Sequence, residues 1–146
     1  MADLHFGIEV SWRGTGKEGE GIVHTGGQTV LVSGPASMGG KGVGSSPEEL
    51  LMSGITACYS ATLFAVLKRA GLPVASVSVK TDGVVSDYPA AAKFDKLTVS
   101  PTIRGGDPEQ VEAYREQAEV ARARCFVGKT VAGNMIYRVG DVQVEA

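Results

Sequence analysis

Residues 46–73 read SPEELLMSGITACYSATLFAVLKRAGLP, and they predict the longest helix of the chain. Ser46, followed by a proline and then Glu49, predicts a capped helix start, because glutamate at the third helical position can bond back to the cap. Gly71 favours the left-handed conformation that ends a helix, and Pro73 prevents continuation. We therefore expect a helix of about 24 residues, about 36 Å long at 1.5 Å per residue.

The interior of this helix carries no charge over eighteen consecutive residues, 50–67, which reaches the length of a membrane span. Its hydroxyl side chains lower the hydropathy and no aromatic belt marks its ends, so we expect no membrane partner. An apolar helix in a soluble protein must be covered on every side. Either the chain's own sheet curls around it, or two copies pack their helices together at the small residues Gly54, Ala57 and Ala61. We favour the homodimer.

Strands are predicted on both sides of the helix. The stretch 4–32 alternates polar and apolar residues between glycine-rich turns, which predicts an antiparallel meander, and the glycine-rich stretch 34–46 reads as a loop. The stretches 74–86 and 94–103 read as two further strands, the second ending near Pro101.

A second helix is expected after residue 107. Asp107 is its cap, and the proline that follows, with Gln110 at the third position, repeats the start signal of the first helix. Inward-facing residues recur there at steps of three and four: Val111, Tyr114, Ala118, Ala121 and Cys125. The tail 134–146 alternates again and reads as a closing strand. These elements predict one α+β domain over residues 1–146.

Charge and composition narrow the class of function. The formal net charge is -2, and the lysines and arginines are scattered among acids, so no basic stripe is available for nucleic acid. The N-terminal residues alternate from the start and lack the charged and apolar regions of a signal peptide, which predicts a cytoplasmic protein.

The two cysteines, Cys58 and Cys125, are too few and too far apart for a zinc site or a disulfide framework. In a reducing cytosol they are either inert core residues or reactive groups that cycle. Cys58 lies about three turns inside the helix, beyond the reach of the helix dipole, and burial raises the pKa of a thiol. A reactive Cys58 therefore requires a cation from elsewhere in the fold or from a partner subunit.

Acidic and basic residues near the two cysteines offer candidates. Glu48 lies about 15 Å from Cys58 along the helix axis, so it cannot touch the thiol but could hold a basic side chain that spans the gap. Cys125 is flanked by Arg122 and Arg124, which either serve the thiol or lie on the solvated side of an amphipathic helix. A second thiol gives a sulfenic acid a partner with which to condense, so the pair suits peroxide reduction.

Two segments resemble the OsmC/Ohr family (osmotically inducible protein C and organic hydroperoxide resistance protein). SSPEELLMSGITACYSATL is similar to the family's Pro-Glu motif with the nucleophilic cysteine at fixed spacing, and ARCFVGKTV is similar to its second-cysteine segment. The start VSWRGTGKEGEG resembles a family hairpin. The resemblance implies an intertwined α+β homodimer of antiparallel sheets around a long cysteine-bearing helix, with active sites at the subunit interface.

The resemblance also implies roles. Cys58 matches the peroxidatic thiol, Cys125 the resolving thiol, and Glu48 the carboxylate that orients an arginine. The implied activity is reduction of organic hydroperoxides, and of hydrogen peroxide in some members, in oxidative-stress defence. A dithiol reductant such as a protein-bound lipoyl group is implied, with no metal and no other cofactor. In place of the family's hairpin arginine this chain offers Arg13 or Lys17, and it has Phe126 where the family usually has proline.

Apolar residues near the thiol are candidates for a substrate pocket that favours alkyl peroxides over hydrogen peroxide: Leu51, Met52, Ile55 and Tyr59. An alternative reading is a binding protein that keeps the dimer and the pocket, lacks efficient chemistry, and holds a small apolar or thiol-reactive ligand.

Overall fold

The computed structural model describes residues 1–146. The chain forms two compact units, Met1–Leu51 and Met52–Ala146, and the boundary between them falls inside the long helix. Sheets and helices both contribute, so the predicted α+β class is confirmed. The assignment of residues 1–146 to a single domain stays a prediction.

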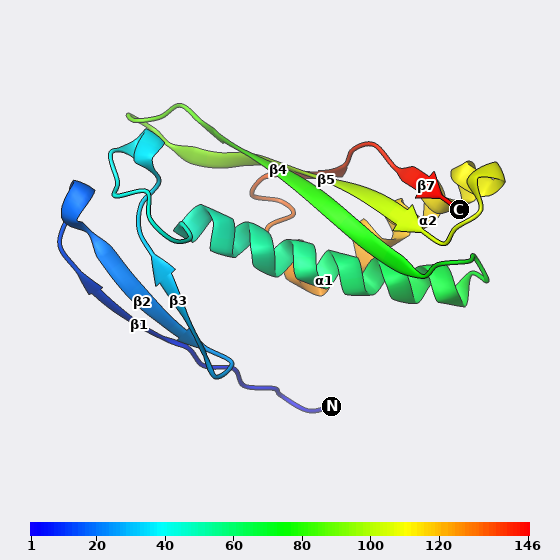
Figure 1. The fold of residues 1–146 in the computed structure, drawn as a ribbon, viewed down its shortest axis with the longest axis horizontal. Helices are drawn as coiled ribbons and strands as arrows, with labels where there is room; N and C mark the ends of the chain where they lie inside the picture. Colours follow the sequence, from blue (N-terminus) through cyan, green and yellow to red (C-terminus); the bar gives the residue numbers. More distant parts are fainter. The chain divides into compact units, whose positions relative to one another are not determined.

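The first unit contains a three-stranded antiparallel sheet, as the sequence predicted. Its strands β1 (Glu9–Arg13), β2 (Glu20–Thr25) and β3 (Gln28–Val32) are ordered β1-β2-β3 (Figure 1). A 3-10 helical turn at Gly16–Glu18 lies between β1 and β2. The pairing of Thr25 with Gln28 leaves a two-residue turn of two glycines between β2 and β3, the shortest connection that an antiparallel pair uses.

The long helix α1 runs from Pro47 to Arg69 with both predicted ends. The Ser46 amide donates to the Glu49 carboxylate at 3.0 Å, and the Glu49 amide donates to Ser46 Oγ at 3.2 Å, which is the reciprocal capping pair expected from the sequence. At the other end Gly71 has a φ of 72°, and its amide and the next one bond back to carbonyls of the last turn. Local sequence therefore fixes the length of α1.

The second unit contains a mixed sheet built around β5. Strand β4 (Ser76–Ser86) pairs antiparallel with β5 (Lys93–Arg104) (Figure 1). Strands β6 (Ile136–Val139) and β7 (Gln143–Glu145) both pair parallel with β5. The tail predicted as one closing strand is thus two short strands in succession along the same edge.

Strand β5 continues through Pro101 instead of ending near it. Pro101 pairs with Val79 of β4 and is buried. On the other side of β5, β6 pairs only as far as Val99 and β7 begins at Thr102. The proline therefore sits at the gap between these two strands, where its missing amide removes no ladder bond on that side.

The second helix, α2 (Val111–Arg124), follows a 3-10 turn at Pro108–Gln110 and precedes the one-turn helix α3 (Phe126–Lys129). The Asp107 carboxylate accepts the Glu109 amide at 3.0 Å, so the predicted cap is confirmed. Four of the five residues predicted to face inward are fully buried, Tyr114, Ala118, Ala121 and Cys125, and Val111 is half-buried.

One face of α1 packs into the core of the second unit, and α1 lies along β4 and β5 (Figure 1). Its buried residues are Ile55, Tyr59, Leu63, Val66 and Leu67. They share one cluster with β5 and α2 residues, and the Tyr59 hydroxyl donates to the Ala118 carbonyl of α2 at 3.0 Å. This packing fixes the rotation of α1 about its axis.

The remaining faces of α1 are uncovered in the single chain. Only 28% of its most apolar window is buried, and Gly54, Ala57 and Ala61 are exposed. Within the second unit, the sheet and α2 therefore cover only one face of the helix. By length and composition α1 could cross a membrane, a test that core helices of soluble proteins also pass.

Candidate functional site

Cys58 lies at the middle of α1, on the edge between the buried and uncovered faces, and it is partly exposed as a free thiol. It opens on a cavity of about 340 Å³, hereafter the Cys58 pocket. Helix α1 contributes one wall of this pocket: Cys58, Ala61, Thr62, Ala65, Val66 and Arg69. Arg124 and Phe126, on either side of Cys125, form the other wall. A small molecule can therefore reach the Cys58 thiol.

Cys125 is a free thiol with no exposed surface, held in the break between α2 and α3. The Gly128 amide donates to Cys125 Sγ at 3.3 Å, and Cys125 Sγ donates to the Ile55 carbonyl at 3.8 Å. Ile55 is one helical turn before Cys58 on α1. Cys125 is thus docked on α1 beside Cys58, the arrangement that a resolving thiol would need.

The pKa of the buried Cys125 thiol differs from that of an ordinary cysteine. Burial raises the pKa of Cys125, the Gly128 N–H lowers it, and the adjacent Cys58 side chain raises it further. Burial likewise raises the pKa of two neighbouring phenols, Tyr59 and Tyr137. Cys125 therefore remains a protonated thiol at neutral pH, which disfavours it as the first nucleophile.

Glu48 lies in the first turn of α1, ten residues before Cys58. Its side chain is half-buried, and its Oε1 atom is buried without a hydrogen-bond partner. A buried carboxylate oxygen with no donor is costly, because it has lost water and gained nothing in exchange. The site is therefore suited to a positive donor that this single chain does not supply.

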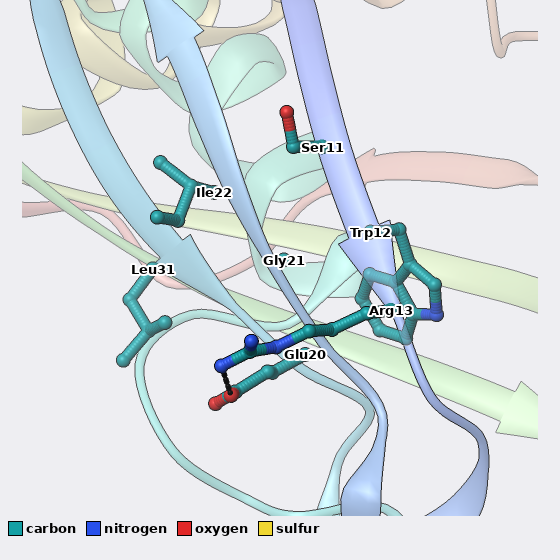
Figure 2. A pocket seen from close by; sticks show the side chains of 7 residues that line it. All are labelled: Ser11, Trp12, Arg13, Glu20, Gly21, Ile22 and Leu31. Carbon is teal, nitrogen blue, oxygen red and sulfur yellow. Dashed lines mark hydrogen bonds and ion pairs between the residues drawn. The ribbon is translucent and has the colours of Figure 1, made fainter.

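The two basic candidates of the first hairpin lie in the first unit. The Arg13 guanidinium bonds Glu20 Oε1 at 3.1 Å (Figure 2), and Lys41 bonds the other oxygen of Glu20 at 2.5 Å. Lys41 and then Arg13 hold the pKa of Glu20 below its ordinary value. The Arg13 side chain is 83% exposed, and Lys17 is exposed in the turn after β1 without an ion pair.

The Arg13–Glu20 pair borders a second cavity, of about 370 Å³, formed on β1 to β3 (Figure 2). Besides this pair, its lining is Ser11, Trp12, Gly21, Ile22 and Leu31. It contains no cysteine, and it lies entirely in the first unit. The pocket that holds the thiol is therefore a different one.

The residues predicted to form a substrate pocket do not line the Cys58 pocket. Ile55 and Tyr59 have no exposed surface and belong to the core, so they cannot line an open pocket in this chain. Met52 packs against that core, and Leu51 is exposed. The sequence places all four near Cys58, but the rotation of α1 turns two of them to the opposite side.

Sequence reasoning missed the residues that do line this pocket. The α1 wall has steps of three and four from Cys58, so counting Ala61, Ala65 and Arg69 along a helical face could have found it. Phe126 and Arg124 belong to another helix, and only the docking of Cys125 on α1 brings them there. No group of three or more His, Cys, Asp or Glu side chains could hold a metal ion.

Comparison with known proteins finds a matching family model and a curated relative. The family model for OsmC-like protein matches residues 39–138. The uncharacterized protein YmaD of Bacillus subtilis is 26% identical over 149 residues, which cover 100% of this chain and 95% of that protein.

Two solved structures share the fold. The OsmC-like protein from Mycoplasma pneumoniae has a TM-score of 0.76 at 16% identity, covering 99% of this chain and 100% of its own. The organic hydroperoxide resistance protein OsmC from Legionella pneumophila has a TM-score of 0.71 at 19% identity, with coverage of 99% and 100%.

Proposed function

Since this chain belongs to the OsmC-like protein family, we propose that it is a thiol-dependent peroxidase that reduces organic hydroperoxides. One observation carries the proposal: a partly exposed thiol opens on a pocket, and a second, fully buried thiol is docked one helical turn away. The name of the Legionella protein, organic hydroperoxide resistance protein, supports the same chemistry. Hydrogen peroxide is a second, poorer substrate because it makes no apolar contacts in the pocket.

The first step uses Cys58. Its thiolate attacks the terminal oxygen of the hydroperoxide, so that an S–O bond forms and the O–O bond breaks. The alkoxide takes up a proton and leaves as an alcohol, while Cys58 becomes a sulfenic acid. Cys58 is the attacking residue because it is the thiol that a substrate can reach.

The second step uses Cys125. Its sulfur attacks the Cys58 sulfenic acid, an S–S bond forms, and the departing hydroxide takes the thiol proton and leaves as water. The docking of Cys125 at the Ile55 carbonyl supports this step, because disulfide formation requires Cα atoms within about 7 Å. A dithiol reductant, such as a lipoyl-bearing protein, then restores both thiols by exchange.

A positive group completes the site in this proposal. Arg13 or Lys17 of the first hairpin supplies it, oriented by Glu48, whose buried Oε1 lacks a donor in the single chain. Arg13 must exchange its exposed pairing with Glu20 to do so, and an exposed ion pair of this kind contributes little to stability because solvent screens it. The uncovered Gly54, Ala57 and Ala61 support a homodimer that covers α1.

The test of the peroxidase is a titration of the thiols. The reduced protein receives one equivalent of cumene hydroperoxide, and mass spectrometry follows free thiol and intramolecular disulfide. Loss of both thiols within seconds supports the enzyme. Oxidation no faster than that of free cysteine would instead support a binding protein for a small apolar or thiol-reactive ligand.

The dimer is tested separately by sedimentation equilibrium of the reduced protein. We expect a mass of about twice the 15.1 kDa of the chain. An Ala57→Arg variant places a charge on the uncovered face of α1 outside the Cys58 pocket, and we expect it to shift the protein toward monomer. A monomeric wild type would contradict the dimer while leaving the thiol titration interpretable.

A further inference from the structure

The hydroxyl group of Tyr137 is buried without a hydrogen-bond partner. Tyr137 lies in β6, is only 7% exposed, and belongs to the same core cluster as Cys125. Its hydroxyl oxygen makes no hydrogen bond in the reduced protein. A buried phenol usually finds a partner, because an unpartnered one has lost its water and gained nothing in exchange. The position of this hydroxyl therefore calls for an explanation.

The unpartnered hydroxyl lies beside the sulfur of Cys125, the resolving thiol of the proposed peroxidase. Gly128 contacts both groups: its amide donates to Cys125 Sγ at 3.3 Å, and a Cβ at position 128 would lie 3.1 Å from the Tyr137 oxygen. Burial raises the pKa of Cys125 most, whereas the Gly128 N–H and the Tyr137 side chain both lower it. Groups that lower this pKa interact more favourably with the thiolate than with the thiol.

The Tyr137 hydroxyl is suited to donate to that thiolate. Burial, and then the negative charge of a Cys125 thiolate, raise the pKa of Tyr137, so the phenol keeps its proton. The sulfur of a thiol is a weak acceptor, whereas a thiolate accepts a stronger, charge-assisted bond. The hydroxyl therefore lacks a partner while Cys125 is protonated and gains one when Cys125 loses its proton.

The other titratable groups around this pair come from α1 and α2: Cys58, Tyr59, Glu119 and Arg122. Cys58 raises the pKa of Cys125. The Tyr59 hydroxyl already donates to the Ala118 carbonyl at 3.0 Å. Glu119 and Arg122 form an ion pair with each other at 3.0 Å. Among these groups, Tyr137 is therefore the side chain with a free donor for the Cys125 thiolate.

We infer that Tyr137 is a positioning residue for disulfide closure, whose hydroxyl donates a hydrogen bond to the Cys125 sulfur as this becomes the attacking thiolate. The inference rests on the proposed peroxidase function. The S–S bond forms as the S–O bond of the Cys58 sulfenic acid breaks, and the Cys125 proton leaves with the departing hydroxide as water. Tyr137 keeps its own proton. The cost of its unpartnered hydroxyl in the reduced protein is offset only while Cys125 is ionised.

The experiment measures disulfide closure without a peroxide. Dithiobis(nitrobenzoate) converts the reachable Cys58 thiol to a mixed disulfide with thionitrobenzoate, and the excess reagent is removed. Attack of Cys125 on the Cys58 sulfur then forms the protein disulfide and releases thionitrobenzoate, whose absorbance is followed. Stopped-flow mixing into buffers between pH 7 and pH 10 gives the closure rate as a function of pH.

Tyr137→Phe keeps the ring and removes only the hydroxyl. We expect closure at pH 7 to slow about threefold, because loss of one charge-assisted donor raises the pKa of Cys125 by about one unit while the less stabilised thiolate attacks faster. The difference from the wild type should shrink as the pH rises. The urea midpoint at pH 7 should not fall, because the variant removes an unpartnered polar group.

Tyr59→Phe is the matched control, since it removes a buried phenol hydroxyl that has a partner. We expect it to lower the urea midpoint and to leave the pH dependence of closure unchanged. A wild-type pH profile in Tyr137→Phe, a slowing that is the same at every pH, or equal effects of the two variants would overturn the inference.

A failure of the peroxidase proposal is distinguishable from a failure of this one. If cumene hydroperoxide leaves Cys58 reduced, the peroxidase proposal fails, and the release of thionitrobenzoate still decides the role of Tyr137. If cumene hydroperoxide oxidises Cys58 and Tyr137→Phe closes its disulfide with the wild-type pH profile, only the inference about Tyr137 fails.

Discussion

The surroundings of Cys58 and Cys125 differ, although Cys125 contacts α1 only one helical turn away from Cys58. Cys58 opens on a pocket with a largely apolar wall, whereas Cys125 has no exposed surface and receives the Gly128 amide. Burial raises the pKa of Cys125. The difference shows how packing alone can divide labour between identical groups, since one thiol can meet a substrate and the other can meet only its neighbour.

Replacing either cysteine by serine is expected to have the largest effect on peroxide turnover. Cys58→Ser is expected to lose all turnover of cumene hydroperoxide, because serine has no nucleophile comparable to a thiolate. Cys125→Ser is expected to keep one fast oxidation and to stop at the sulfenic acid. Stopped-flow peroxide consumption and mass spectrometry of the products measure both. A Cys58→Ser variant that turns over normally would end the proposed mechanism.

Alkaline pH tests the burial of the Cys125 thiol and of the two phenols beside it. The pKa values of Cys125, Tyr59 and Tyr137 are raised above their ordinary values of 9.0 for the thiol and 10.0 for the phenols. The stability that these neutral groups contribute is full below pH 9 and declines as the pH rises above it, by at most about 1.4 kcal/mol per pH unit for each group.

Urea unfolding midpoints between pH 7 and pH 11 test this decline. Cys125→Ala removes one of the three groups, so its midpoint should fall less steeply above pH 9 than that of the wild type. A wild-type midpoint that stays constant up to pH 11 would contradict the burial of all three groups.

Gly128→Ala perturbs the Cys125 side alone. A Cβ at position 128 would lie 2.4 Å from the Tyr137 ring, so the ring or the backbone must move. We expect a loss of roughly 1–3 kcal/mol of stability. Disulfide closure should slow while the first oxidation of Cys58 is unaffected.

The control for this change is Gly7→Ala, because a Cβ at position 7 meets no atom within 4 Å. Thermal unfolding measures stability, and quenched-flow mass spectrometry measures the two oxidation steps separately. A Gly128→Ala variant as stable as Gly7→Ala would show that the contact with Tyr137 relaxes without cost.

Ser46→Ala tests the smallest effect, at the start of the helix that carries Cys58. Removing Ser46 Oγ leaves the Glu49 amide without its acceptor, which costs about 1 kcal/mol of stability. Cys58 lies three turns further on, so its oxidation rate should stay unchanged. Ser45→Ala, which removes a side chain with no hydrogen bond, is the control in the same chemical denaturation series. An equal loss of stability in both variants would contradict the cap.

The elements that the sequence predicted correctly are those whose interacting residues lie close together along the chain. The ends of α1 and the cap at Asp107 are set by contacts within a few residues, and the meander pairs strands that follow one another directly in the chain, so composition and spacing predicted them. The continuation of β5 through Pro101 was not predicted, because it depends on where two distant strands stop and start.

The candidate site divides in the same way. The residue pattern alone placed one thiol deep in an uncharged helix and a second at the end of an amphipathic helix. Packing in the folded chain sets which face of α1 is buried, so that Ile55 and Tyr59 lie in the core while Arg124 and Phe126 line the Cys58 pocket. The physical reason is that α1 is apolar all round, so its rotation is fixed only by the sheet and helix that pack against it.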